Sequence, residues 1–387
     1  MTYITISGYN DTAGNWRFIA SPLEVTTAPT MVENMITTTE YDLYQFNQSA
    51  NDGEWQNYKA NNFNLLNGHG YLYASTDDVN IIFKGDFNEN DTKEIALAYD
   101  ANATFAGWNL VGNPFPVSAY ANRSYYVMNE DGTAIEPVAV SMETAIPACT
   151  GVMVKADAAG ESVTFSKMAP EAAVNQGVLQ IAVAQANTRG NAVEDKVIVS
   201  FNAKDHLEKF VFNKDNAQIS IPQGGKDLAI ACAERVGEVP LNFKASRNGQ
   251  YTLSVNLEDM EMDYLHLIDN MTGADIDLLA TLSYTFNAKT TDYASRFRLV
   301  FSASGDAYGD NEVFAYFRDG EIIIRADVCN ASLQVVDVTG RVVVSRKGDA
   351  INRVSTNGMA PGVYVLRLVD GNDVRTQKIV IPQISSL

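Results

Sequence analysis

The sequence predicts an all-β, multidomain protein built from several antiparallel β-sandwiches. Short runs of β-branched and aromatic residues recur along the chain, for example at 79–83, 196–201 and 296–301, between turns rich in Gly, Asn, Asp and Pro. Apolar residues at helical spacing with caps at their ends are nearly absent. A length of 387 residues exceeds one compact domain, so we expect several.

Composition limits the classes of function. The chain carries 47 acidic and 28 basic side chains, and its formal charge of -19 opposes binding to nucleic acid. No run of basic residues marks a local basic patch. No stretch approaches the roughly 20 apolar residues that span a bilayer. The three cysteines, Cys149, Cys232 and Cys329, lie far apart without a CxxC spacing, so we expect buried thiols rather than disulfides or zinc ligands.

The first region, residues 1–168, contains an internal duplication. The segment Trp16-Arg-Phe-Ile-Ala-Ser-Pro22 matches Trp108-Asn-Leu-Val-Gly-Asn-Pro114, and the strand starting at Gly70 matches the one starting at Gly151. We therefore expect two copies of one β-unit that share a core, with Trp16 and Trp108 inside it. A second region, residues 174–303, reads as an antiparallel sandwich of roughly eight strands.

The third region, residues 311–387, carries a series of motifs in a fixed order. An Asp337-x-Thr-Gly-Arg341 turn is followed by a Gly362-Val-Tyr-Val strand and a final Lys378-Ile-Val strand. This order resembles the type A C-terminal sorting domain of the Bacteroidota type IX secretion system, and the resemblance implies a small Ig-like sandwich at the carboxyl end. The chain runs past the last motif by Pro382-Gln-Ile-Ser-Ser-Leu387, which departs from the usual end of that family.

The resemblance implies partners, a location and a set of recognition residues. The partners are the type IX machinery and its sorting peptidase, followed by attachment to outer-membrane lipopolysaccharide. The location is the extracellular space or the outer-membrane surface, reached through the periplasm. We expect the peptidase to cut in the Gly- and Ser-rich stretch 302–310. The side chains expected to be recognised, with the glycines that shape their turns, are Gly340, Arg341, Gly362, Tyr364 and Lys378.

Residues 1–8 lack the basic and apolar segments of a secretory signal, which proteins with this sorting domain use to cross the inner membrane. We therefore expect the chain to be the carboxyl-terminal part of a longer protein.

Local residue patterns suggest two further candidate ligand sites, each with a structural alternative. Asp86, Asn88 and Asn90 place oxygen side chains at alternate positions, as the first half of a calcium loop does, but Asp91 and Leu97 stand where that loop needs Gly and Glu. A polar hairpin turn is the alternative. Trp55 and Tyr58 lie beside predicted loops with Asn57, Asn61 and Asn62 nearby, which suits a sugar site; core packing is the alternative.

Catalytic and cofactor motifs are missing from the sequence: there is no HExxH, GxSxG, P-loop or GxGxxG pattern. We therefore expect a non-catalytic secreted or surface protein without a cofactor, whose upstream domains serve as spacer, adhesion or ligand-binding modules for glycans or host proteins. One alternative is that these domains are accessories of a secreted protease or glycosidase whose catalytic domain lies elsewhere. A second alternative is a carbohydrate-binding module in the first region.

Overall fold

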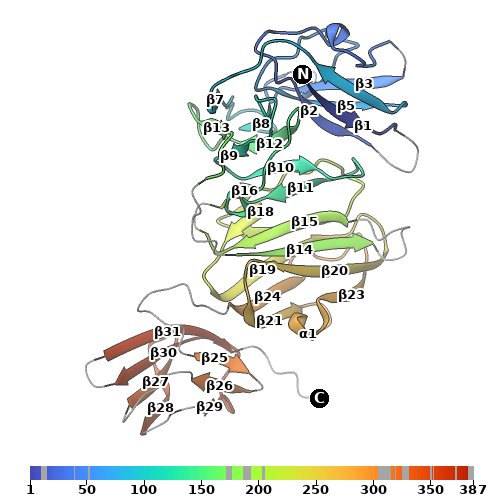
Figure 1. The fold of residues 1–387 in the computed structure, drawn as a ribbon. Helices are drawn as coiled ribbons and strands as arrows, with labels where there is room; N and C mark the ends of the chain where they lie inside the picture. Colours follow the sequence, from blue (N-terminus) through green and yellow to red (C-terminus); the bar gives the residue numbers. More distant parts are fainter. Residues whose placement is uncertain are drawn as a thin grey trace.

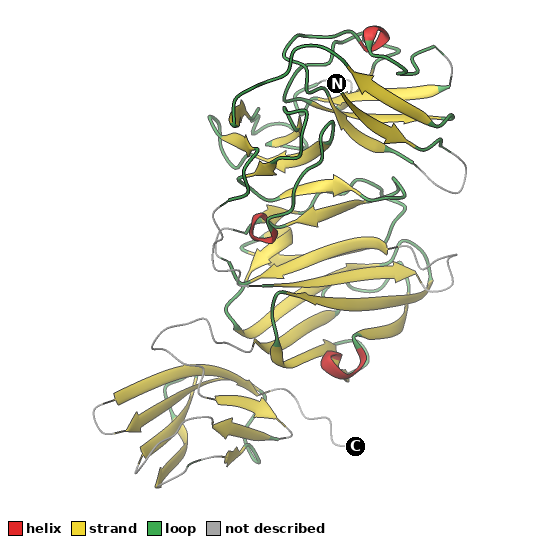
Figure 2. Ribbon diagram, in the orientation of Figure 1, coloured by secondary structure: helices red, strands yellow, loops and turns green. Residues whose placement is uncertain are grey.

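The computed structural model confirms that the protein is nearly all β (Figure 2). It describes residues 1–9, 15–38, 40–50, 53–170, 177–185, 193–202, 205–303, 315–318, 320–324, 331–348, 351, 353–370 and 373–381. Cys329, the tail 382–387 and most of the expected cleavage stretch 302–310 lie outside these residues. In the described part, no helix is long and apolar enough to cross a membrane.

The first copy of the duplicated unit has a four-stranded sheet of order β2-β5-β3-β4 and an antiparallel pair β1-β6, whose strands lie far apart in the sequence. The strands are β1 (Thr2–Ile6), β2 (Arg17–Ala20), β3 (Tyr41–Phe46), β4 (Trp55–Asn57), β5 (Gly70–Ser75) and β6 (Val79–Phe83), with a 3₁₀ turn η1 (Pro29–Met31).

The second copy has a four-stranded sheet of order β8-β12-β10-β11 and a smaller sheet β7-β13-β9. The strands are β7 (Thr92–Ala96), β8 (Trp108–Gly112), β9 (Tyr120–Ala121), β10 (Tyr125–Met128), β11 (Ile135–Val138), β12 (Gly151–Lys155) and β13 (Ser162–Ser166), with a 3₁₀ turn η2 (Val140–Met142). Strand by strand, β2, β5, β3 and β4 of the first sheet therefore correspond to β8, β12, β10 and β11 of the second.

The two copies meet through reciprocal backbone contacts. Ile19 in β2 bridges Thr150 before β12, and the equivalent Val111 in β8 bridges His69 before β5. The backbone N–H of Ala20 donates to Cys149 O at 2.8 Å, and the N–H of Gly112 donates to Gly68 O at 2.9 Å. Because each contact has its counterpart with the copies exchanged, the joint has approximate two-fold symmetry.

Glycine at two equivalent positions permits this close approach. A Cβ on Gly70 would lie 2.6 Å from Val111 O and 2.8 Å from Leu110 Cγ. A Cβ on Gly151 would meet Ile19 O at 3.1 Å and Gly70 Cα at 3.3 Å. Neither glycine adopts a positive φ, so glycine is needed at these positions because it has no side chain and not because of its backbone freedom.

The second region forms one large sheet that folds over on itself as a sandwich, in the order β22-β21-β24-β19-β17-β18-β15-β14-β20-β23, with β16 on β18. Its strands are β14 (Val178–Gln185), β15 (Val193–Ser200), β16 (Leu207–Glu208), β17 (Gln218–Gln223), β18 (Lys226–Cys232), β19 (Val236–Lys244), β20 (Gly249–Glu258), β21 (Met262–Asp269), β22 (Ala274–Asp277), β23 (Ser283–Ala288) and β24 (Phe297–Ala303), with one short helix α1 (Leu278–Thr281). The β15–β18 pair is parallel, which the sequence pattern did not indicate.

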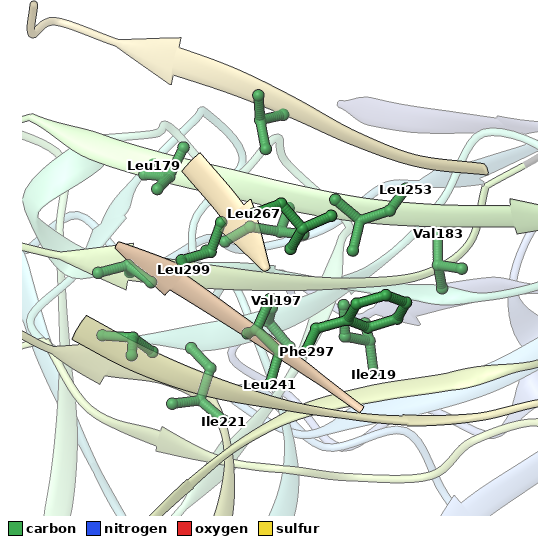
Figure 3. Close-up of a cluster of buried hydrophobic side chains, with 14 of the residues drawn as sticks. Leu179, Val183, Val197, Ile219, Ile221, Leu241, Leu253, Leu267, Phe297 and Leu299 are labelled. Carbon is green, nitrogen blue, oxygen red and sulfur yellow. The ribbon is translucent and has the colours of Figure 1, made fainter. Parts of the chain in front are cut away.

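Apolar side chains from both halves of this sandwich point toward one another, among them Leu179, Val197 and Leu299 (Figure 3). One buried ion pair sits at the edge of this core: Arg296 Nη2 lies 2.8 Å from Asp269 Oδ2. Phe286 stacks on the guanidinium, 4.5 Å from ring centroid to Cζ. Burial acts to raise the pKa of Asp269, but hydrogen bonds from Arg296 and from Met271 N–H outweigh it and lower the pKa.

The third region packs a three-stranded sheet β25-β26-β29 on a four-stranded sheet β28-β27-β30-β31. Its strands are β25 (Ala315–Arg318), β26 (Glu321–Ile324), β27 (Ala331–Asp337), β28 (Val342–Gly348), β29 (Arg353–Ser355), β30 (Gly362–Asp370) and β31 (Asp373–Ile381).

An apolar cluster joins the first region to the second, and the three regions follow one another in an elongated arrangement (Figure 1). Trp108 and Tyr126 from the second copy pack with Phe210 and Ile230 from the sandwich. Trp108 is buried as expected, whereas Trp16 is only partly buried at the rim of the same cluster. The third region contacts the sandwich through far fewer side chains, with Val363 and Val380 against Ile268 and Val300.

We expect Gly70→Ala to destabilise the first region by about 1–3 kcal/mol, because the new methyl group overlaps the backbone and side chain of β8. Gly237→Ala in β19 is the matched control: that position has no atom within 4 Å of an added Cβ. Urea unfolding of both variants measures the difference. Equal midpoints for the two variants would contradict the role given to the joint.

Candidate functional site: the carboxyl-terminal sandwich

The Asp337–Arg341 turn links β27 to β28 and satisfies its own polar groups. Asp337 Oδ1 accepts hydrogen bonds from Thr339 Oγ1 at 2.6 Å, from Thr339 N and from Arg341 N; Oδ2 accepts from Arg341 Nε at 3.0 Å. Gly340 has a φ of +83° and donates its N–H to Asp337 O. These bonds lower the pKa of Asp337 to about 2, the Thr339 hydroxyl contributing most. The Asp, Thr, Gly and Arg positions of the motif therefore each build the turn, while the Arg341 side chain stays largely exposed.

Tyr364 lies in the core rather than on the surface, with 6% of its area exposed. Its hydroxyl donates to Ala360 O at 2.7 Å, four residues upstream, which is the bond of a tyrosine corner in immunoglobulin-like sandwiches. Gly362 starts β30, opposite Ile381 of β31. The Tyr364 ring thus stabilises the fold, and a partner cannot contact it without opening the core. The recognition roles of Gly362 and Tyr364 stay predictions.

Lys378 is exposed on β31 and belongs to a basic sheet face that the sequence analysis missed. We use this name for the side of β28-β27-β30-β31 that points away from the core. The ladder aligns three rows across it: Val336–Val365–Lys378, Gln334–Arg367–Thr376 and Lys347–Ser332–Val369–Val374. Lys347 and Arg367 are exposed like Lys378. No single run of sequence holds the three cations, so only the strand register brings them to one face.

Comparison with known families then decides what this region is. Residues 318–382 match the model of a secretion system C-terminal sorting domain. The chain carries a type IX secretion sorting domain. This confirms the resemblance from the motifs, and it indicates export to the cell surface or extracellular space and contact with the type IX machinery.

Two further comparisons add little about the rest of the chain. No curated protein matches it. A solved structure described as a biofilm associated protein, BSP domain, is 10% identical and covers 100% of this chain and 96% of that chain. Its TM-score of 0.17 is too low to support an argument on fold or function.

Trp55 and Tyr58, the expected sugar-binding rings, are both partly buried in ring clusters. Trp55 meets Phe46 and Phe212 edge-to-face at centroid distances of 5.0 and 6.1 Å. Tyr58 meets Phe63 at 5.2 Å. The Trp55 contact joins the first copy to Phe212 of the sandwich, and the Tyr58 contact lies within the first copy. Both rings therefore have a packing role, and sugar binding by this pair stays an untested prediction.

In the expected calcium loop, one of the three side-chain oxygens and several backbone carbonyls accept hydrogen bonds from the protein itself. Asn88 is buried and its Oδ1 accepts from Asn90 N at 3.0 Å, while the Asp86 carbonyl accepts from Glu24 N. The Lys167 ammonium donates to the carbonyls of Asn88 and Glu89. A lysine thus supplies the positive charge beside this loop, and the geometry is that of a polar turn; calcium binding there stays a prediction.

Asp157, His206 and Glu208 form a possible metal-ligand set within the described residues, with ligand atoms within 4.8 Å of one another. Both carboxylate oxygens of Glu208 are already paired, with Lys155 and Lys226. Two ammonium groups therefore balance this cluster without a metal.

The thiols that can be described agree with a structural role. Cys149 is buried and Cys232 is partly buried, and both are free. Burial raises the pKa of Cys149 to about 11, so this thiol is a poor nucleophile near neutral pH.

We expect the Asp337 carboxyl to titrate near pH 2, below the usual value of about 3.9. Because the folded state lowers this pKa, the turn contributes its full stability above about pH 3.9 and loses it as the pH falls toward 2. Carboxyl NMR of the folded protein measures the midpoint. Thr339→Ala should raise it toward the usual value, and an unchanged midpoint in that variant would contradict the assigned cause.

Proposed function

We propose that this chain is a non-catalytic segment of a secreted or surface protein, in which residues 1–303 form a stiff stalk and the sorting domain directs export and surface attachment. The main support for this proposal is the apolar cluster that packs the first region against the sandwich. Polar contacts cross the same boundary: Lys196 Nζ lies 2.8 Å from Glu136 Oε2, and Ser141 N donates to buried Asp205 at 3.1 Å. A fused boundary of this kind resists bending between the two regions.

The geometry supports a spacer that presents its far end. The first region lies at one end of the elongated arrangement and the sorting domain at the other (Figure 1). A peptidase cut before the sorting domain and joining to lipopolysaccharide, both implied by the family, would fix the stalk at one end and leave the first region to contact glycans or host proteins. The alternative, accessory domains of a secreted protease or glycosidase, depends on a catalytic domain elsewhere in the parent protein.

A glycan-binding role for the first region is a second candidate, and a specific cavity favours it. A hollow of about 400 Å³ is lined by Tyr9, Trp16 and Tyr41 together with Glu40, Asp42 and Lys59. The Lys59 ammonium lies 3.2 Å from Asp42 Oδ1 and 4.7 Å from the centroid of the Tyr41 ring, which leaves Tyr9, Trp16 and Glu40 as the groups most open to a ligand. Aromatic rings beside carboxylates suit a sugar, whose C–H faces stack on rings and whose hydroxyls donate to oxygens. This cavity, and not the pair Trp55 and Tyr58, is the better candidate in the first region.

The export function predicts the fate of a fusion protein. A reporter carrying a signal peptide and residues 306–387 should leave the cell in a host with a type IX system. Cell fractionation and reporter activity in the medium and on intact cells measure this. The same fusion ending at residue 361 lacks β30 and β31 and should stay in the periplasm. Periplasmic retention of the full fusion would contradict the proposal.

The glycan candidate predicts binding of the full chain to an array of glycans, with a loss of about five-fold or more in affinity for Trp16→Ala and Tyr9→Ala, if a sugar face on one ring contributes as much as a stacked nucleobase does, about 1–3 kcal/mol. Tyr3→Ala is the control, because Tyr3 is 62% exposed on β1 and does not line the cavity. If no glycan binds, or if all three variants bind equally, the cavity is not a sugar site.

A further inference from the structure

The sorting domain differs in charge from everything before it. Residues 315–387 contain nine Lys and Arg against seven Asp and Glu, a formal charge of +2. The preceding 314 residues contain 19 basic and 40 acidic side chains, a formal charge of -21. The net charge of the whole chain hides this contrast.

The basic sheet face concentrates the positive charge. Lys347, Arg367 and Lys378 stand on β28, β30 and β31, in three successive rows of the ladder. Neighbouring strands are roughly 5 Å apart and alternate residues roughly 7 Å, so the cations follow a diagonal across the sheet. No described outward position of these four strands carries a carboxylate.

The chemistry between the cations favours a protein partner. Val342, Val365 and Val374 are 48%, 42% and 51% exposed on these strands. Hydroxyls of Ser345 and Thr376 and the amide of Gln334, which accepts from Arg367 Nη1 at 3.5 Å, lie among them. Arginine is enriched at protein interfaces, and the exposed apolar and hydrogen-bonding groups around Arg367 suit such a contact, with the two lysines at its margins. A small anion would instead need a concave site with converging donors.

We propose that the type IX machinery binds the sorting domain through this basic sheet face, and that the receptor surface is acidic. The inference rests on the proposed export function and names the surface that performs it. An acidic receptor attracts the +2 domain and repels the -21 body, so the chain approaches with its sorting domain first. Lys347 and Arg367 join Lys378 as recognition residues.

Part of this face is covered in the full chain. Val363 and Val380, one row beyond Lys378, pack on Ile268 and Val300 of the sandwich. Lys378 borders a cavity of about 270 Å³ beside Glu234 and Glu238. The rows with Arg367 and Lys347 lie farther from this contact, so a receptor can engage them before the sorting domain leaves the sandwich.

Export of the full chain behind a signal peptide tests the proposal in a type IX host. The triple variant K347E/R367E/K378E should be exported at least ten-fold more slowly than the unchanged chain, since charge complementarity changes association rates by about 10–1000-fold. The conservative variant K347R/R367K/K378R should be exported normally. The matched control is R346E, because Arg346 is exposed on β28 next to Lys347 but pairs with the core residue Leu333 and lies off this face.

Several results would overturn the proposal. Normal export of the triple variant excludes the basic sheet face, while export of the unchanged chain still supports the sorting function. An equal loss of export in R346E would show that export depends on the total positive charge of the domain rather than on this face. Far-UV circular dichroism checks that each variant is folded. If the triple variant unfolds, R367E alone replaces it in the export test. Binding of the purified chain to phosphatidylglycerol vesicles that disappears in the triple variant would assign the face to anionic lipid instead.

Discussion

The close backbone approach at Gly70 and Gly151 is the constraint on which the arrangement of the first region depends. Two four-stranded sheets meet there through paired backbone contacts, Ile19 with Thr150 and Val111 with His69. A side chain at this joint would hold the sheets apart. The two-fold relation then leaves one face of the second sheet, with Trp108 and Tyr126, free to cover the sandwich. One steric condition thus connects a duplicated sequence to the way the first region packs on the sandwich.

The same arrangement explains why aromatic residues are so frequent in the first region. Large rings fill the boundary between the first region and the sandwich: Phe210 lies 4.9 Å from Trp108 and 6.2 Å from Phe46, between centroids. Ring pairs in edge-to-face geometry stabilise such contacts beyond the area they bury. Trp55 belongs to this packing, whereas Tyr9 and Trp16 at the margin remain beside a cavity.

Local features were predictable from the sequence, and features that depend on register were not. The strands, the duplication and the Asp337–Arg341 turn follow from residue patterns within a few positions. Trp55 was placed at a loop because its packing partner Phe212 lies more than 150 residues away along the chain. Lys347, Arg367 and Lys378 could not be grouped, because a one-residue change of register would send each of them to the other face. The core position of Tyr364 was not predictable, because the sequence pattern of β30 does not show which of its two sides meets the core.

The contacts between the three regions differ in strength in a way that suits export. The first region is fixed to the sandwich by a large aromatic cluster and buried polar bonds, whereas the sorting domain meets it through a few side chains around Val363 and Val380. A weak apolar contact, aided by attraction between a +2 domain and a -21 body, holds the tail in place but can be replaced by a receptor of complementary charge. Because buried apolar area sets most of the cost of separation, the sorting domain separates from the sandwich at far lower cost than the first region would.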